Sequence, residues 1–199
     1  MHKTIYNWVD LNIFKPYNTE QLRKKLCLSD KFIILGVTQQ WMPSKGVNIF
    51  LQLSEMLSDD FLILMIVTPS NYSGNERIKF IGVTDNVEQL ADYYNIADVF
   101  LNHSLQETFG KTTAEALACG TPVIAFNTTA SPELVGTDEK CGYIVKENTA
   151  QAYLKNIELI QKNSKKHFST DCRSRAEFLF NKKANINEYI NIYNKLISK

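Results

Sequence analysis

The sequence predicts an α/β domain in which a mainly parallel sheet lies between helices. Short apolar runs alternate along the chain with segments whose apolar residues recur at helical spacing, the pattern of strand–helix–strand units. The chain has 199 residues, of which 44% are hydrophobic. This is enough to bury one sizeable core, and it favours a single domain.

Each expected element rests on a local pattern. The strands are apolar runs bounded by turn residues, and they are expected at residues 32–37, 61–67, 78–81, 99–102, 123–126 and 142–145. The helices carry apolar residues three and four positions apart, and they are expected at residues 47–57, 87–96, 113–119, 150–160, 171–180 and 187–197. Gly120 and Pro122 stop the helix at 113–119.

The turn between strand 99–102 and helix 113–119 is the most informative part of the chain. The N–H groups at a helix start have no intrahelical partner, so the amides of residues 110–113 could hold a diphosphate. Glu107, in the turn, is placed to accept hydrogen bonds from sugar hydroxyls, and Glu115, in the helix, to accept a bidentate pair from a ribose diol. Taken alone, the two glutamates could also be ordinary carboxylates near a helix start.

A lysine after the first strand is a second candidate for phosphate binding. Lys45 lies in a turn rich in Pro, Ser and Gly and opens a helix, so its ammonium and the helix amides could grip phosphate together, although a solvated loop lysine is the alternative. In parallel sheets, ligands bind beyond the carboxyl ends of the strands. Because Lys45, Gly82 and Glu107 each follow a strand, we expect them to gather on one edge of the sheet.

The two glutamates and their surroundings resemble the donor-site signature of retaining family 4 glycosyltransferases. Seven residues separate Glu107 from Glu115, with Phe109 and Gly110 between them and the run ACGTPV at 118–123 after them. Further similar segments lie at residues 5–10, 14–16, 33–36, 45–47, 93–99 and 142–145. The similarity covers roughly residues 5 to 150 and implies the two-domain GT-B architecture, of which this chain would be the C-terminal, Rossmann-like half.

The resemblance also implies roles for individual residues. Lys45 and Glu107 would be catalytic: the lysine stabilises the departing diphosphate, and the glutamate orients the sugar without acting as a covalent nucleophile. The donor-binding residues would be Gly82, Val83, Phe109, Gly110, Lys111, Thr112 and Glu115. Gly82 and Val83 would belong to a loop that reads the nucleobase through backbone groups, or else to an ordinary turn before a helix.

The chain departs from the family pattern after its first strand. Many relatives carry an arginine there that shares the diphosphate with the lysine, but residues 36–42 contain none. Either Lys45 and backbone amides carry the charge, or Gln39 or Trp41 helps, or donor affinity is weak. Thr129 stands in a later loop where a glycine is more usual.

The domain organisation follows from the same resemblance. Residues 1–30 are expected to lead in from a missing N-terminal acceptor domain, residues 31–164 to form the nucleotide-sugar-binding Rossmann-like domain, and residues 165–199 to form a C-terminal helical tail. We expect the isolated chain to bind a nucleotide sugar and to transfer nothing alone, whether it is an excised part of a larger enzyme or a natural truncation.

The implied function is transfer of a hexosyl unit from a nucleoside diphosphate sugar, expected to be a UDP-sugar, to a saccharide or lipid-linked acceptor. Capsule, lipopolysaccharide or other cell-envelope polysaccharide synthesis is the expected setting, and no metal or cofactor is expected. Two alternatives stay open: an epimerase-like domain of the non-hydrolysing nucleotide-sugar type, and a non-catalytic nucleotide-sugar-binding module. The nucleobase, sugar, acceptor and oligomeric state are not predicted.

Composition argues against other classes of partner. Lys and Arg number 22 against 21 Asp and Glu, so the net charge of +1 gives no bulk attraction to nucleic acid or to an anionic membrane. The longest apolar run, at 61–67, is well short of the ~20 residues that cross a bilayer. The four cysteines form no Cys-x-x-Cys pair, which favours reduced thiols and a cytoplasmic location. Peripheral attachment to the inner face of the membrane would occur through the missing N-terminal domain.

Overall fold

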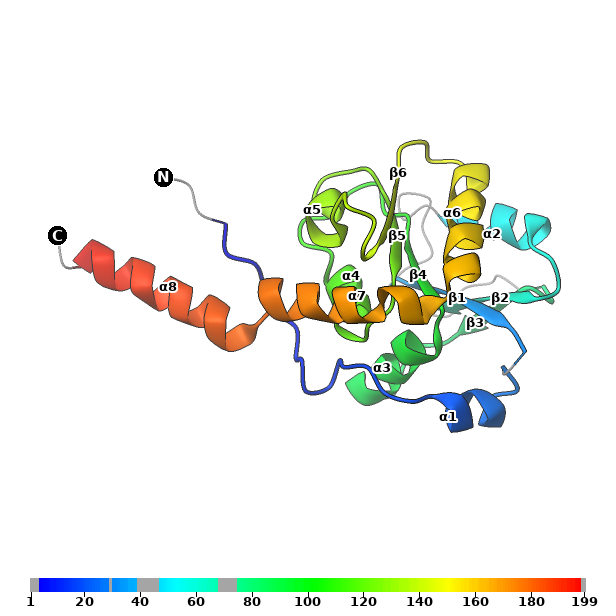
Figure 1. The fold of residues 1–199 in the computed structure, drawn as a ribbon, viewed down its shortest axis with the longest axis horizontal. Helices are drawn as coiled ribbons and strands as arrows, with labels where there is room; N and C mark the ends of the chain where they lie inside the picture. The colour runs from blue at the N-terminus through cyan, green and yellow to red at the C-terminus, as the bar shows by residue number, and fades with distance from the viewer. Residues whose placement is uncertain (1–3, 29, 39–46, 68–74, 198–199) are drawn as a thin grey trace.

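A parallel sheet forms the centre of the molecule (Figure 1). The computed structural model describes residues 4–28, 30–38, 47–67 and 75–197. The strands are β1 Phe32–Val37, β2 Phe61–Ile66, β3 Ile78–Ile81, β4 Val99–Asn102, β5 Val123–Phe126 and β6 Gly142–Val145. They lie in the order β3-β2-β1-β4-β5-β6, and each neighbouring pair is parallel. This confirms the expected α/β fold and places the reversal of strand order between β1 and β4, where such sheets bind ligands.

Helices pack on both sides of this sheet. In the described ranges they are α1 Glu20–Lys25, α2 Val47–Met56, α3 Val87–Ile96, α4 Lys111–Ala118, α5 Ser131–Val135, α6 Ala150–Asn163, α7 Lys165–Leu179 and α8 Lys182–Ile197. Helices α7 and α8 begin before the expected residues 171 and 187. The sequence did not predict their first turns, because these turns are rich in Lys, Asn, Ser and Thr and show no apolar stripe. The short helices α1 and α5 were not expected from the sequence.

Helix α4, which begins at the candidate site, is buried from its third residue onward. Every side chain from Thr113 to Ala118 is buried, since α4 lies between the sheet and α7 (Figure 1).

Beneath α2, Gly36 of β1 leaves room for neighbouring side chains: a Cβ there would lie 2.4 Å from both Met65 Sδ and Phe50 Cζ. The close fit between α2 and β1 therefore requires glycine at this position.

The N-terminal segment is held against α7. The N–H of Val9 donates to the carbonyl of Phe180 at 3.2 Å. Arg173 of α7 donates through Nη1 to Phe14 O at 2.7 Å and to Ala118 O at 3.0 Å, and through Nη2 to Leu11 O at 3.2 Å. One guanidinium thus joins the N-terminal segment, the end of α4 and α7.

Helix α8 extends away from the sheet on the side where the N-terminal segment also leaves the domain (Figure 1). Only Asn185 of this helix is buried. Its exposed large apolar side chains are Tyr189, Ile190, Ile192, Tyr193, Leu196 and Ile197. This helix therefore leaves a large apolar surface in contact with solvent. Among the helices of the described ranges, none combines the length and apolar character needed to cross a membrane.

Candidate functional site

The turn that joins β4 to α4 presents an uncapped helix start. Gly110, the N-cap residue, has φ +80° and provides no side-chain cap. The first intrahelical bond runs from Ala114 N to Gly110 O at 3.0 Å, so the N–H groups of Lys111, Thr112 and Thr113 come before it. These N–H groups and the positive end of the helix dipole form an anion-binding geometry.

Side-chain hydrogen bonds stabilise the start of this turn. Asn102, the last residue of β4, donates from Nδ2 to Thr113 Oγ1 at 2.8 Å, and its Oδ1 accepts from Ser104 N at 3.1 Å. His103 is buried beside Phe50, with ring centroids 4.4 Å apart in an edge-on arrangement. Its burial and its ring contact with Phe50 give His103 a local structural role at the end of β4.

Glu107 is supported by the loop after β5. Its backbone N–H donates to Thr129 Oγ1 at 3.0 Å, and Thr128 Oγ1 donates to Leu105 O at 2.9 Å. Thr129 has φ +42°, in the region that favours glycine. Its hydroxyl contact with the backbone N–H of Glu107 gives a physical reason for a threonine at this position.

A pocket opens beside this turn. It has a volume of about 470 Å³ and is lined by Asn7, Trp8, Glu107, Thr108, Phe109, Gly110 and Lys111. Trp8 is 40% exposed, and Lys182 Nζ lies 5.9 Å from the centroid of its ring. Trp8 was not among the site residues predicted from the sequence. The signal that could have found it is an aromatic residue in a segment, 5–10, that already resembled the family.

The start of α4 also contributes to a second, more apolar pocket, through Thr112. It has a volume of about 200 Å³ and is lined by Val37, Thr38, Ile66, Val67, Val83, Thr84, Leu90 and Thr112. These residues come from the carboxyl ends of β1 and β2, the loop after β3, and helices α3 and α4. The structure thus brings Val83 and Thr112 together, while a Cβ on the neighbouring Gly82 would have no atom within 4 Å.

Glu115 lies one helical turn after Lys111, facing the interior. Its Oε2 accepts a hydrogen bond from Tyr94 Oη at 3.1 Å, and its Oε1 lies 3.6 Å from Lys111 Nζ. Burial raises the pKa of the Glu115 carboxyl, and the nearby lysine and tyrosine only partly oppose this effect. A ribose diol that binds this carboxylate would therefore replace the exposed Lys111 contact and leave the buried Tyr94 contact in place.

Lys45, Gln39 and Trp41 lie outside the described residues, so the structure does not describe the predicted phosphate-binding lysine or the candidates for the missing arginine. Within the ranges that the structure covers, no group of three or more His, Cys, Asp or Glu side chains could hold a metal ion. Among the other predicted site residues, Glu107, Phe109, Gly110 and Lys111 line the pocket of about 470 Å³, and Val83 and Thr112 line the pocket of about 200 Å³. Gly82 and the buried Glu115 line neither of these two pockets.

We expect Gly110→Ala to lower the free energy of unfolding by about 2 kcal/mol, because alanine is strained at positive φ. Its Cβ would also lie 2.8 Å from Leu134 Cδ1. Gly82→Ala is the matched control, since a Cβ at that position meets nothing within 4 Å. Urea unfolding of both variants measures the effect; equal stabilities for the two would contradict it.

Together, the fold and the site define a doubly wound, Rossmann-like domain with an uncapped helix start close to the reversal of strand order. The chain belongs to the Glycosyl transferases group 1 family, whose profile matches residues 18–177. It is 31% identical over 153 residues to D-inositol 3-phosphate glycosyltransferase of Segniliparus rotundus, an alignment that covers 69% of this chain and 34% of the relative. The chain therefore spans about a third of the length of that curated relative.

Solved structures show the same fold within longer chains. Sucrose-phosphate synthase from Thermosynechococcus elongatus matches with a TM-score of 0.84 and 24% identity, covering 98% of this chain and 53% of that one. Anabaena Alr3699/HepE in complex with UDP and glucose matches with a TM-score of 0.79 and 19% identity, covering 99% of this chain and 57% of that one. Almost the whole chain, including its C-terminal helices, thus corresponds to about half of each of these proteins.

Proposed function

We propose that this chain is the donor-binding half of a retaining family 4 glycosyltransferase that uses a UDP-hexose. One observation carries the proposal: the uncapped start of α4 contributes consecutive residues to two pockets, Thr112 to the apolar 200 Å³ pocket and Lys111 to the 470 Å³ pocket that contains Glu107. A nucleotide sugar has the same order of parts, with a flat base at one end, a diphosphate in the middle and a polyol at the other end.

Each part of the donor finds a chemically suitable environment. The base fits the pocket lined by Val83 and Thr112, and the diphosphate fits the N–H groups at the start of α4. The ribose diol reaches Glu115 beside Lys111. The hexose fits the pocket with Glu107, where exposed Trp8 provides an aromatic surface for the C–H face of the ring. The Anabaena protein that shares this fold has been crystallised with UDP and glucose, which supports the choice of donor class.

The chemistry requires stabilisation of charge on the leaving group. When the bond between the hexose and UDP breaks, negative charge develops on the β-phosphate, and the α4 amides together with Lys45 stabilise it electrostatically. Glu107 holds the sugar hydroxyls and so fixes the exposed face of the anomeric carbon. The diphosphate leaves from the same face of the anomeric carbon that the acceptor hydroxyl attacks, and a phosphate oxygen assists removal of the hydroxyl proton. The anomeric configuration is therefore retained without a covalent intermediate and without a metal.

The acceptor site belongs to another part of the enzyme. The chain corresponds to about half of the solved structures that share its fold, and the apolar surface of α8 projects on the side where the N-terminal segment leaves. We assign this surface to contact with an N-terminal acceptor domain. The acceptor is a saccharide or a lipid-linked saccharide, the setting is cell-envelope polysaccharide synthesis at the cytoplasmic side of the membrane, and the isolated chain binds donor but transfers nothing.

Replacing Glu107 by Ala tests the assignment of the hexose pocket. Because Glu107 is placed to contact only the sugar, we expect the affinity for UDP-glucose to fall about tenfold while the affinity for UDP stays unchanged. Calorimetric titration with UDP and UDP-glucose measures both constants. Glu147→Ala, an exposed glutamate that lines neither pocket, is the control. Equal losses for the two ligands, or no loss for either, would contradict the assignment.

A further inference from the structure

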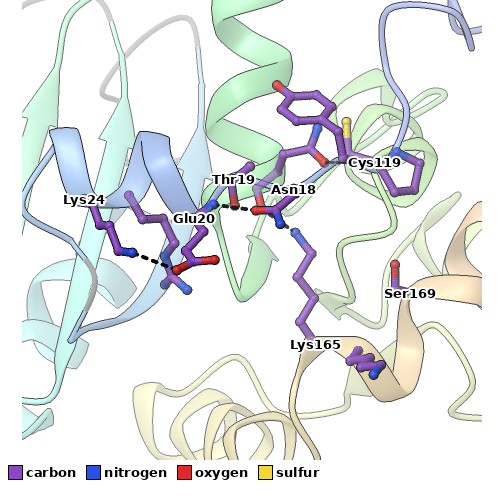
Figure 2. Close-up of a pocket in the computed structure, with 12 residues that line it drawn as sticks. Asn18, Thr19, Glu20, Lys24, Cys119, Lys165 and Ser169 are labelled. Atoms are coloured by element: carbon purple, nitrogen blue, oxygen red, sulfur yellow. Dashed lines mark hydrogen bonds and ion pairs between the residues drawn. The ribbon is translucent and has the colours of Figure 1, made fainter.

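A third pocket lies at the amino ends of the strands, at the opposite edge of the sheet from the donor-site pockets. Figure 2 shows the residues that line it. Helices α3 and α4 both end there, since α3 is followed directly by the start of β4 and α4 by the start of β5. The pocket has a volume of about 600 Å³ and also receives residues from α1 and from the start of α7. None of the residues that line the two donor-site pockets contributes to it.

The lining of this pocket is strongly basic. Glu20 is the one carboxylate in it, and Asp98 neutralises a further charge through an ion pair with Arg23 at 2.7 Å. Two positive charges remain in excess, on a chain whose whole net charge is +1. The basic side chains that line the pocket are Arg23, Lys24, Lys165 and Lys166.

Two of these cations are held in place by the fold. Lys165 Nζ donates to the carbonyls of Tyr94, Asn95 and Ala97, at 3.2, 2.8 and 2.8 Å, and its side chain reaches from α7 toward Asn18 and Thr19 (Figure 2). These contacts use its three N–H groups, so it acts on a ligand as a fixed charge. Burial lowers the pKa of Lys165 to about 8, which shows that the charge is poorly solvated where it lies.

Arg23 is the second fixed cation. Its Nη2 donates to Asp98 Oδ2 and to the carbonyl of Lys31. Its Nε is buried and has no hydrogen-bond partner within the described residues. Arg23 therefore adds a second fixed positive charge to the wall of the pocket, and this charge attracts an anionic ligand electrostatically.

The other two cations are free to adapt to a ligand. Lys24 forms an ion pair with the exposed Glu20, one helical turn away, at 2.8 Å (Figure 2). Lys166 is exposed at the start of α7. Ser169, one turn further along α7, adds a hydroxyl to the same wall.

We propose that this pocket binds a phosphate monoester. Such a group carries a charge of about −2 at neutral pH and has three strong acceptor oxygens, which match two excess positive charges surrounded by N–H and O–H donors. The phosphate can belong to a soluble phosphorylated metabolite or to the headgroup of a membrane lipid. Because the site is separate from the donor pockets, the proposal does not rest on the function proposed above.

The test uses the whole chain, saturated with UDP so that a phosphate probe cannot enter the donor site. Glycerol 3-phosphate is titrated by calorimetry, and vesicles of phosphatidylcholine with and without phosphatidic acid are tested by sedimentation. The variant combines Lys24→Gln with Lys166→Gln. The control combines Lys155→Gln with Lys183→Gln, which replace two exposed lysines on α6 and α8 and so remove the same amount of charge elsewhere. Lys165 is left intact because it holds the end of α3.

Binding of glycerol 3-phosphate that is weakened about tenfold or more by the first pair of substitutions and unchanged by the second supports the site and indicates a soluble ligand. Binding of phosphatidic acid vesicles alone, with the same dependence on Lys24 and Lys166, supports the site and indicates a lipid headgroup. The proposal is overturned if neither probe binds the parent protein, or if the two pairs of substitutions weaken binding equally. The proposal is also overturned if the probe binds only when UDP is left out, because the probe would then occupy the donor site.

Discussion

Replacing Glu115 by Gln is expected to weaken UDP binding about tenfold to hundredfold. Under the proposed donor assignment, the carboxylate oxygen that faces the ribose is replaced by an amide NH₂ group when the amide oxygen keeps the contact with Tyr94. The same substitution is expected to make the protein more stable at neutral pH. Glu115 is buried, its Oε2 accepts from Tyr94 Oη, and an amide oxygen can keep that contact without carrying a buried charge. A gain in stability together with a loss of binding is typical of a functional charge.

The pH dependence of stability has a definite sign. Burial raises the pKa of Glu115 above the ordinary value of 4.5, so the folded protein holds this proton more tightly than the unfolded chain does. The contribution of Glu115 to stability is complete below the unfolded value and is lost as the pH rises through the folded value. Parent and Glu115→Gln should therefore have similar stability near the acid end of this window and diverge above it, with the variant more stable.

Thermal unfolding across this pH range, with UDP titration at neutral pH, measures both effects. Glu158→Gln on the exposed side of α6 is the matched control and should change neither quantity. A Glu115→Gln variant that binds UDP as tightly as the parent would remove the ribose assignment. A variant that is less stable than the parent at neutral pH would show that the Lys111 and Tyr94 contacts outweigh the cost of burial.

Arg173→Met is expected to lower the free energy of unfolding by about 3 kcal/mol, the largest loss of stability that we predict for a single side chain. The guanidinium donates to the carbonyls of Leu11, Phe14 and Ala118. Methionine fills a similar volume but donates to none of them, so partly buried carbonyls in three places lose their partner. The N-terminal segment should then separate from α7.

Urea unfolding measures the loss, and protease sensitivity of the N-terminal segment locates it. Glu177→Gln is the control: it removes the ion pair with Arg173 Nε at 2.7 Å but leaves the carbonyl contacts. Since Glu177 is half exposed, we expect this variant to lose less than about 0.5 kcal/mol. If Glu177→Gln is as destabilising as Arg173→Met, the ion pair and not the carbonyl contacts holds the segment.

Local patterns in the sequence were sufficient to predict the sheet and the turn at the donor site. Each strand is a continuous apolar run, so its position does not depend on what packs against it, and the structure places the strands at the expected residues except that β2 ends at Ile66. The strand, the turn with Gly110 and the following helix lie next to one another in the chain. The geometry of an uncapped helix start could therefore be predicted without knowledge of distant contacts.

Tertiary contacts decided what local pattern could not. The first turns of α7 and α8 have no apolar stripe, and α7 begins at Lys165 because that ammonium satisfies carbonyls at the end of α3, some seventy residues earlier. Trp8 and the basic pocket likewise join segments that are far apart in the chain. The sequence alone therefore determined the α/β fold and the uncapped turn before α4, since both follow from neighbouring residues. The tertiary structure alone decided where the two glutamates lie, what surrounds them and which cations share the opposite edge, because such contacts depend on how the helices pack.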